Sequence, residues 1–263
     1  MGALCYQIHK VRDLSVISIT ETQSLVIACD SNASIGEKPA DYYKNSYDEV
    51  AVSALKVPMM EVIATGASPL VVINNLCVEM EQTGRHIITI MRQELDRHGY
   101  DGRLQITGST EDNMPTVQTG IGVTVVGMLD VENNHIGQTR KDDLIICVGI
   151  PRSGIKEHYS EFQPDVANIG TVRQLVGASF VHEILPIGSK GAAYEAGQLC
   201  QTAGLVFEAV DSPVDTATSA GSSTAVLCSI DPRDYSKLDR VINCPYHVIG
   251  KALVETKLKE ITK

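Results

Sequence analysis

The sequence lacks the features that would place it in a membrane or on a nucleic acid. No hydrophobic run approaches the length of a membrane-spanning helix, and the first residues, MGALCYQIHKVRD, lack the apolar core of a signal peptide. Acidic residues outnumber basic ones by 32 to 22, so the chain does not offer the positive surface that binding to nucleic-acid phosphates requires. We therefore expect a cytoplasmic protein that binds neither nucleic acid nor membrane.

Paired cysteines are also missing. The seven cysteines are widely spaced, odd in number, and include no C-x-x-C pair. A disulfide framework or a zinc site would need closer, paired spacing. We therefore expect reduced and mostly buried thiols at Cys5, Cys29, Cys77, Cys147, Cys200, Cys228 and Cys244.

What is present is an ordinary globular composition, 43% hydrophobic and 21% charged, without repeats, heptads or low-complexity segments. Short apolar strands are interspersed with segments of helical period, which predicts an α+β fold in two α/β halves. The polar segment 130–141 predicts the boundary between a domain of residues 1–135 and a domain of residues 136–263. Strands are predicted at 14–19, 25–29, 70–73, 105–107, 120–129, 143–149, 205–210 and 224–229. Helices are predicted at 85–97, 170–178 and 191–203, and a helix or strand pair at 234–259. A long polar loop is predicted at 31–48.

A carboxylate interrupts the apolar run VAVSALKVPMMEVIATGASPLVVINN at residues 50–75. Read as a helix that stops at Gly66, this run surrounds Glu61 with uncharged neighbours. A carboxylate on a packed helix face must be protonated, ion-paired or bound to a metal, because burying an unpaired charge is costly. The alternative is a partly exposed glutamate at a helix edge.

Three further acids lie at strand ends or in loops of the first half. Asp30 is predicted to end the strand LVIAC, Asp13 to precede the first strand, and Glu111 to follow a strand in ITGSTEDNMPT. Side chains at such places often bind ligands, and converging carboxylates can hold Mg²⁺ together with waters and phosphate oxygens. Each acid alone is equally compatible with a turn or surface residue, and the spacing does not establish that they converge.

A glycine-flanked loop in the second half, Gly188-Ser189-Lys190-Gly191, precedes the helical pattern AAYEAGQLC. Backbone N–H groups at a helix N-terminus, with a hydroxyl and an ammonium beside them, suit an oxyanion. The loop is not a Walker A motif, and an ordinary loop with a glycine N-cap is the alternative. A second small polar cluster, Ser219–Thr224, precedes a strand and is compatible with a simple turn.

In their order along the chain, these segments resemble the superfamily of aminoimidazole ribonucleotide synthetase, which includes thiamine-monophosphate kinase, selenophosphate synthetase and the hydrogenase maturation dehydratase. The superfamily signature N-D-x-x-x-x-G-A-x-P is similar to MEVIATGASP at 60–69, where Glu61 stands at the acid. In the segment GSTE at 108–111, the acid Glu111 is displaced by one position relative to the superfamily pattern. The other resembling segments are RDLS at 12–15, CD at 29–30, GSTE at 108–111, GVTVVG at 122–127, DDLIICVG at 142–149 and VIGK at 248–251.

The resemblance implies a homodimer in which the first halves of two subunits form a shared β-barrel, with ATP and Mg²⁺ held at the interface by acids. It implies Asp13, Asp30 and Glu61 as metal and nucleotide ligands, with Glu111 as a further candidate. We add Lys38 as a candidate ATP contact, because the 31–48 loop has the length and polarity to close over a ligand. The candidate nucleotide and phosphate contacts are thus Lys38, Gly66, Gly188, Ser189, Lys190 and Gly191, with Lys190 the candidate catalytic residue.

Three functions are compatible with this resemblance. The compact chain and simplified second half look most like the short branch containing α-ribazole kinase, an ATP-dependent phosphotransferase of cobalamin salvage acting on a small nucleoside. A ring-closing ligase is disfavoured, because the family's D-G-V-G-T-K loop stands here as DSNASIGEK at 30–38. A non-catalytic nucleotide-binding member is the third hypothesis, suggested by the reduced acid motifs at 12–13 and 108–111.

Overall fold

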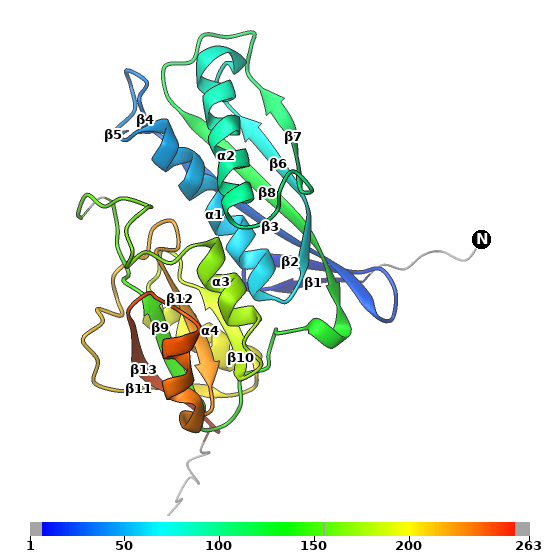
Figure 1. Cartoon of the computed structure of the whole chain (residues 1–263), viewed down its shortest axis with the longest axis vertical. Coiled ribbons are helices and arrows are strands. Elements are labelled where there is room, and N and C mark those ends of the chain that lie inside the picture. Colours follow the sequence, from blue (N-terminus) through cyan, green and yellow to red (C-terminus); the bar gives the residue numbers. More distant parts are fainter. Residues whose placement is uncertain (1–6, 155, 256–263) are drawn as a thin grey trace, which may run out of the picture.

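The computed structural model describes residues 7–154 and 156–255 and contains two large β-sheets with helices packed against them (Figure 1). The first sheet has the order β1-β2-β3-β8-β6-β7, in which only β6 and β7 are parallel neighbours. Its strands are β1 (Ile8–Val11), β2 (Leu14–Ser18), β3 (Gln23–Ala33), β6 (Ser68–Leu76), β7 (Gln105–Thr110) and β8 (Gly120–Asp130).

The second sheet is fully antiparallel and has the order β10-β12-β9-β13-β11. Its strands are β9 (Leu144–Gly149), β10 (Val181–Pro186), β11 (Val206–Ala209), β12 (Ala225–Ile230) and β13 (Tyr246–Leu253). A short parallel pair, β4 (Ile35–Gly36) and β5 (Tyr43–Lys44), lies between β3 and the first helix. The helices are α1 (Tyr47–Ala64), α2 (Arg85–Arg97), α3 (Ile169–Val176) and α4 (Ala192–Thr202), with shorter helical turns η1 (Met80–Gly84), η2 (Val131–Asn133) and η3 (Pro232–Arg240).

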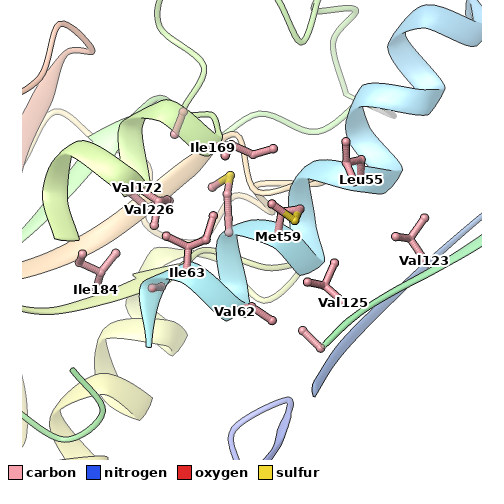
Figure 2. Close-up of a cluster of buried hydrophobic side chains, with 14 of the residues drawn as sticks. Leu55, Met59, Val62, Ile63, Val123, Val125, Ile169, Val172, Ile184 and Val226 are labelled. Carbon is pink, nitrogen blue, oxygen red and sulfur yellow. The ribbon is translucent and has the colours of Figure 1, made fainter. Parts of the chain in front are cut away.

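Helix α1 lies at the centre of the molecule. Its N-terminus is capped by Ser46, whose hydroxyl oxygen accepts a hydrogen bond from the Glu49 backbone N–H at 3.3 Å. The helix is apolar on nearly every side, because it packs against both halves of the chain. Figure 2 shows its side chains between strand β8 on one side and elements of the second half on the other, with Leu55, Met59, Val62 and Ile63 from α1, Val123 and Val125 from β8, and Ile169, Val172, Ile184 and Val226 from the second half.

The second sheet alternates its core-facing side chains between two faces, as a strand period of two requires. Ile146 and Val148 of β9 face the core shared with α1 and α3, whereas Ile145 and Cys147 face α4. Both faces are therefore covered, which explains why β9 and β12 are almost continuously apolar.

Two buried ion pairs join the halves. Arg12, in the turn between β1 and β2, pairs with Glu183 of β10, and Lys56 of α1 pairs with Glu161. The Glu183 carboxylate also accepts hydrogen bonds from the backbone N–H of Gly137 at 2.9 Å and from Thr139. Since removing one partner of a buried pair leaves an uncompensated charge, these pairs fix how the two sheets face each other.

The predicted α+β class and most predicted elements are confirmed, but two details of the first half are wrong. Asp30 does not end its strand, because β3 continues to Ala33 and Asp30 lies opposite Val123 of β8. Residues 31–48 are not one long loop, since they contain the end of β3, the β4–β5 pair and the start of α1. Strands β1 and β10 were not predicted. Residues 234–255 of the segment 234–259 contain most of η3 and the single strand β13, and residues 256–259 lie outside the described residues.

The cysteine prediction is confirmed only in part. All six cysteines in the described ranges are unpaired, but Cys29 and Cys77 are exposed and Cys244 is half-buried. Cys147, Cys200 and Cys228 are buried, and Cys5 lies outside the described residues.

Each large sheet is built from one side of the predicted boundary, the first from residues 8–130 and the second from residues 144–253. The division into domains 1–135 and 136–263 stays a prediction, because one continuous core includes residues of both parts. Among the helices of the described ranges, none is long and apolar enough to cross a membrane.

Candidate active site

Four carboxylates and two cations gather where the β1–β2 turn, β3, α1 and the start of α4 meet. They are close enough to influence one another's protonation. The group, called the acidic cluster below, consists of Asp13, Asp30, Glu61 and Glu195, with Arg12 and Lys190 beside them. Asp13 and Asp30, two of the predicted metal ligands, are therefore near Glu61, although Asp13 and Glu61 are 48 residues apart in the sequence, and binding of a metal by these acids stays a prediction.

Glu61 is held at the protein interior by α1 but keeps part of its surface exposed. Removal from water raises its pKa to about 8; the Arg12 guanidinium opposes this rise, and the carboxylates of Glu195, Asp13 and Asp30 add to it. Each of the two interpretations of Glu61 from the sequence, a packed carboxylate and a partly exposed one, is therefore partly correct. Glu61 lies at a helix edge, and it is also an acid that other charges and burial keep from ionising easily.

Asp30 and Glu195 are the half-buried members of the acidic cluster beside Glu61. Burial raises the pKa of Asp30, and a hydrogen bond from the Ser31 backbone partly offsets this effect. Burial also raises the pKa of Glu195 to about 7; Asp13 raises it further, while Arg12 and Lys190 lower it. Glu195 was missed by the sequence analysis, although its place in the first turn of a helix directly after the G-S-K-G loop was a usable signal.

Lys190 is exposed at the tip of the Gly188–Gly191 loop and reaches toward the acidic cluster. Its ammonium donates a hydrogen bond to the Tyr194 hydroxyl at 3.1 Å and lies 4.2 Å from the centre of the Tyr194 ring. The hydrogen bond to Tyr194, and then the charges of Asp13 and Glu195, raise the pKa of Lys190. The loop therefore presents an exposed cation beside the carboxylates, which is where a phosphate would need one.

Two of the predicted glycines have structural reasons to be glycine. Gly66 has φ +89°, and a Cβ there would lie 1.8 Å from the Asn133 carbonyl oxygen. Gly191 has φ +85°, and its Cβ would lie 2.7 Å from the Thr216 carbonyl oxygen. Gly188 and Ser189 lie in the turn before α4, with Ser189 exposed. Contacts of Gly66, Gly188, Ser189 and Gly191 with a nucleotide stay predictions.

Glu111 lies apart from the acidic cluster. One of its carboxylate oxygens accepts hydrogen bonds from the backbone N–H of Asn113 at 2.7 Å and of Met114 at 3.2 Å. It thus organises the turn that follows β7, as a turn acid does.

Lys38 is buried instead of facing an open loop. Its ammonium donates to Glu79 at 2.6 Å and to the Thr116 carbonyl at 3.3 Å. The hydrogen bond from Lys38 is the main reason why the pKa of Glu79 falls to about 2. Because Asp41 also accepts bonds from the backbone of Lys38 and Thr119, the segment is tied to β8, and contact of Lys38 with ATP would require its release.

The acidic cluster suits a magnesium ion in its chemistry, although within residues 7–154 and 156–255 no three metal-ligating side chains are already close enough to hold one. Carboxylate oxygens are the donors Mg²⁺ prefers, and the ion commonly binds through one or two carboxylates while keeping several waters. The raised pKa values of Asp30, Glu61 and Glu195 show an environment in which added positive charge would favour ionisation.

Comparisons with known proteins find solved structures with a similar fold. No family model and no curated protein matches the sequence. Among solved structures, AaThiL complexed with AMPPCP and TMP has 16% identity, a TM-score of 0.64, and coverage of 94% of this chain and 87% of that chain. Thiamine-monophosphate kinase from Stenotrophomonas maltophilia has 13% identity, a TM-score of 0.64, and coverage of 97% and 90%. T. maritima PurL complexed with ATP has 15% identity and a TM-score of 0.63, and its match covers 91% of this chain and 42% of that chain.

This chain shares their fold. The superfamily resemblance drawn from the sequence motifs is therefore confirmed at the level of fold. The narrower likeness to the α-ribazole kinase branch stays a prediction.

Proposed function

We propose that the protein is an ATP-dependent kinase that transfers the γ-phosphate to a small nucleoside-like acceptor, with α-ribazole as the best candidate. The observation that carries this proposal is the convergence of Asp13, Asp30, Glu61 and Glu195 beside Lys190. A cluster of carboxylates with an exposed cation suits phosphoryl transfer, since that reaction depends mainly on positioning and charge stabilisation. The fold shared with structures complexed with ATP or with AMPPCP supports the choice of nucleotide.

In this proposal the acidic residues would bind the metal ion and the lysine would bind the phosphate. Asp13, Asp30 and Glu61 would hold Mg²⁺, which when bound would neutralise part of the triphosphate charge. Lys190 would leave Tyr194 to donate hydrogen bonds to the transferring phosphoryl group, for which its exposed position gives the freedom.

We further propose that the protein is a homodimer formed through the first sheet. Helices α1 and α2 lie on one face of this sheet (Figure 1). The opposite face is apolar at Leu25 and Ile27 of β3, Val126 and Met128 of β8 and Val71 of β6, and no helix of the described ranges packs on it. Edge strands and an uncovered apolar sheet face favour association, and a second copy would cover this face and form the shared barrel.

Two other functions remain candidates. A cyclo-ligase would use the same ATP site with a different acceptor, and a non-catalytic member would bind nucleotide without turnover. Purified protein should be incubated with Mg·ATP and each candidate acceptor, while ADP and the acceptor product are measured. A phosphorylated nucleoside supports the kinase, ring closure of an amidine supports the ligase, and ATP binding without ADP formation under any condition supports the non-catalytic protein.

A further inference from the structure

A pocket of about 370 Å³ lies between the two halves of the chain. Its volume is within the range of small-molecule sites. One wall comes from the end of β3, the β4–β5 pair and the first turns of α1. The other wall comes from Ser153, Gly154, Tyr159, Glu161, Ser219, Gly221 and Ser222. The small polar cluster Ser219–Thr224 of the sequence therefore contributes to this pocket, since Ser219, Gly221 and Ser222 line it.

The pocket has polar groups held in position on both walls. On one wall the Ser222 hydroxyl donates to Glu161 and lies 3.0 Å from the Tyr159 hydroxyl. On the other wall the Asn32 amide donates to the Ser53 hydroxyl at 3.2 Å. These hydroxyl and amide groups can each form a further hydrogen bond, so they suit a ligand that carries hydroxyl groups or ring nitrogens.

An aromatic side chain forms one border of the pocket. The Tyr43 hydroxyl lies 2.8 Å from Nδ1 of His158, which fixes its ring across the junction of the halves. The neighbouring Tyr42 also lines the pocket and is 87% exposed. Rings at a pocket border suit contact with a planar ring system.

The charge of the pocket lining disfavours ligands that carry a phosphate group. Glu49 and Glu161 line it, whereas its described lining contains no lysine, arginine or histidine. The buried ammonium of Lys56 is already paired with Glu161 of the lining. A phosphate group placed here would lie beside the Glu49 carboxylate and the Lys56–Glu161 pair, without a free cation among the lining residues, which is unfavourable in a partly dehydrated site.

The pocket is next to the acidic cluster. Asn32 follows Asp30 by two residues on β3, so both side chains lie on the same face of that strand. On the opposite wall, the Ala220 backbone N–H donates to the Gly188 carbonyl at 3.2 Å, which joins the 219–222 segment to the G-S-K-G loop. The pocket is therefore connected through β3 to Asp30 and through the 219–222 segment to the loop that carries Lys190.

We propose that this pocket binds the acceptor of the kinase reaction, and that the acceptor is an uncharged or cationic compound with a planar ring and hydroxyl groups but no phosphate. This inference rests on the proposed function and narrows it. The acceptor would differ from the phosphate ester for which the structurally similar thiamine-monophosphate kinases are named.

Binding measured by calorimetry without ATP and without Mg²⁺ tests the inference apart from catalysis. The probes are adenosine, uridine and α-ribazole, each compared with its own 5′-monophosphate. We expect at least one nucleoside to bind, and to bind about tenfold or more tightly than its monophosphate, because charge repulsion of about 1.4 kcal/mol changes affinity tenfold.

Variants locate the binding. Ser53→Leu on α1 and Ser153→Leu on the opposite wall both fill the pocket, and each should weaken nucleoside binding by about tenfold or more by occlusion. Gln93→Leu, a similar change at an exposed position of α2, should leave the affinity unchanged. A thermal unfolding curve for each variant identifies any that fails to fold.

Three results would overturn the inference: equal or tighter binding of the monophosphates, unchanged affinity in both folded pocket variants, or no binding by any of the three nucleosides. Nucleoside binding as expected, but without any phosphorylated product when Mg·ATP is added, would leave the pocket assignment standing and reject the kinase function. The two proposals therefore fail in different experiments.

Discussion

Replacing Glu61 by glutamine should stabilise the metal-free protein above about pH 8 and have little effect near pH 4. The pKa of Glu61 is raised from 4.5 to about 8, first by burial, against the attraction of Arg12 and with the repulsion of nearby carboxylates. Between these two values the folded protein retains a proton that the unfolded chain has lost. Stability therefore falls as the pH rises through this window, and it is not affected by Glu61 below it.

The size of the expected change in stability follows from the pKa shift of Glu61. A pKa raised from 4.5 to about 8 corresponds to at most about 5 kcal/mol of destabilisation by the ionised carboxylate. Because part of the Glu61 side chain remains accessible, solvent screens the charge, and we expect about 1–3 kcal/mol. Glutamine resembles the protonated acid in shape and removes the charge, so the variant should gain this amount at high pH.

Denaturant unfolding at pH 4, 7 and 9 measures the effect, with Glu208→Gln at an exposed position of β11 as the matched control. The free energy difference between Glu61→Gln and the wild type should grow from pH 4 to pH 9, and added Mg²⁺ should reduce it at pH 9 by stabilising the wild type. An equal free energy difference at all three pH values would refute the electrostatic reasoning, and a loss of stability at pH 9 would show that Glu61 makes a favourable contact when ionised.

Other predictions concern the site and the assembly. Asp30→Asn should abolish Mg·ATP turnover while the circular dichroism spectrum and the unfolding midpoint stay near wild type; full activity would remove Asp30 from the metal site. Lys190→Ala should lower kcat/KM by about ten- to hundredfold, because a charge-assisted phosphate contact is lost; steady-state kinetics near wild type would reduce the loop to a helix cap. Lys38→Ala should destabilise the protein by about 1 kcal/mol through loss of its bond to Glu79, and a change in ATP affinity without a change in stability would contradict this placement. Val126→Asp on the uncovered sheet face should convert a dimer into a monomer in sedimentation, and an unchanged dimer would place the interface elsewhere.

Local signals in the sequence predicted α1 and its end. The apolar run, Gly66 and Pro69 were sufficient, because a glycine that permits φ > 0 and a following proline are sequence features with direct backbone consequences. The unusual position of Glu61 was likewise visible as a charge without charged neighbours. What the sequence could not show was which other groups surround Glu61, because those groups come from three other elements.

Strand β10 was not predicted, because its polar side chains have partners that are distant in the sequence. Its segment VHEILP has a histidine and a glutamate next to each other, which is atypical for a buried strand. Both are accommodated by partners distant in sequence, since His182 bonds to Asp143 at 2.7 Å and Glu183 pairs with Arg12. Glu195 was overlooked because, along the chain, it is only one acid in a helix, and its approach to Asp13 depends on how the two halves pack.

The two buried ion pairs have a consequence for exchanging parts between proteins of this fold. Lys56 and Arg12 belong to the first half, whereas their partners Glu161 and Glu183 belong to the second. A chimera that joined residues 1–135 to the second half of another protein would leave two interior cations unmatched unless both acids were transferred with it. Each unmatched charge costs about 3–5 kcal/mol, and two of them approach the whole stability of a typical domain. We therefore expect the complete chain, and not either half, to be the unit that recombination can pass on intact.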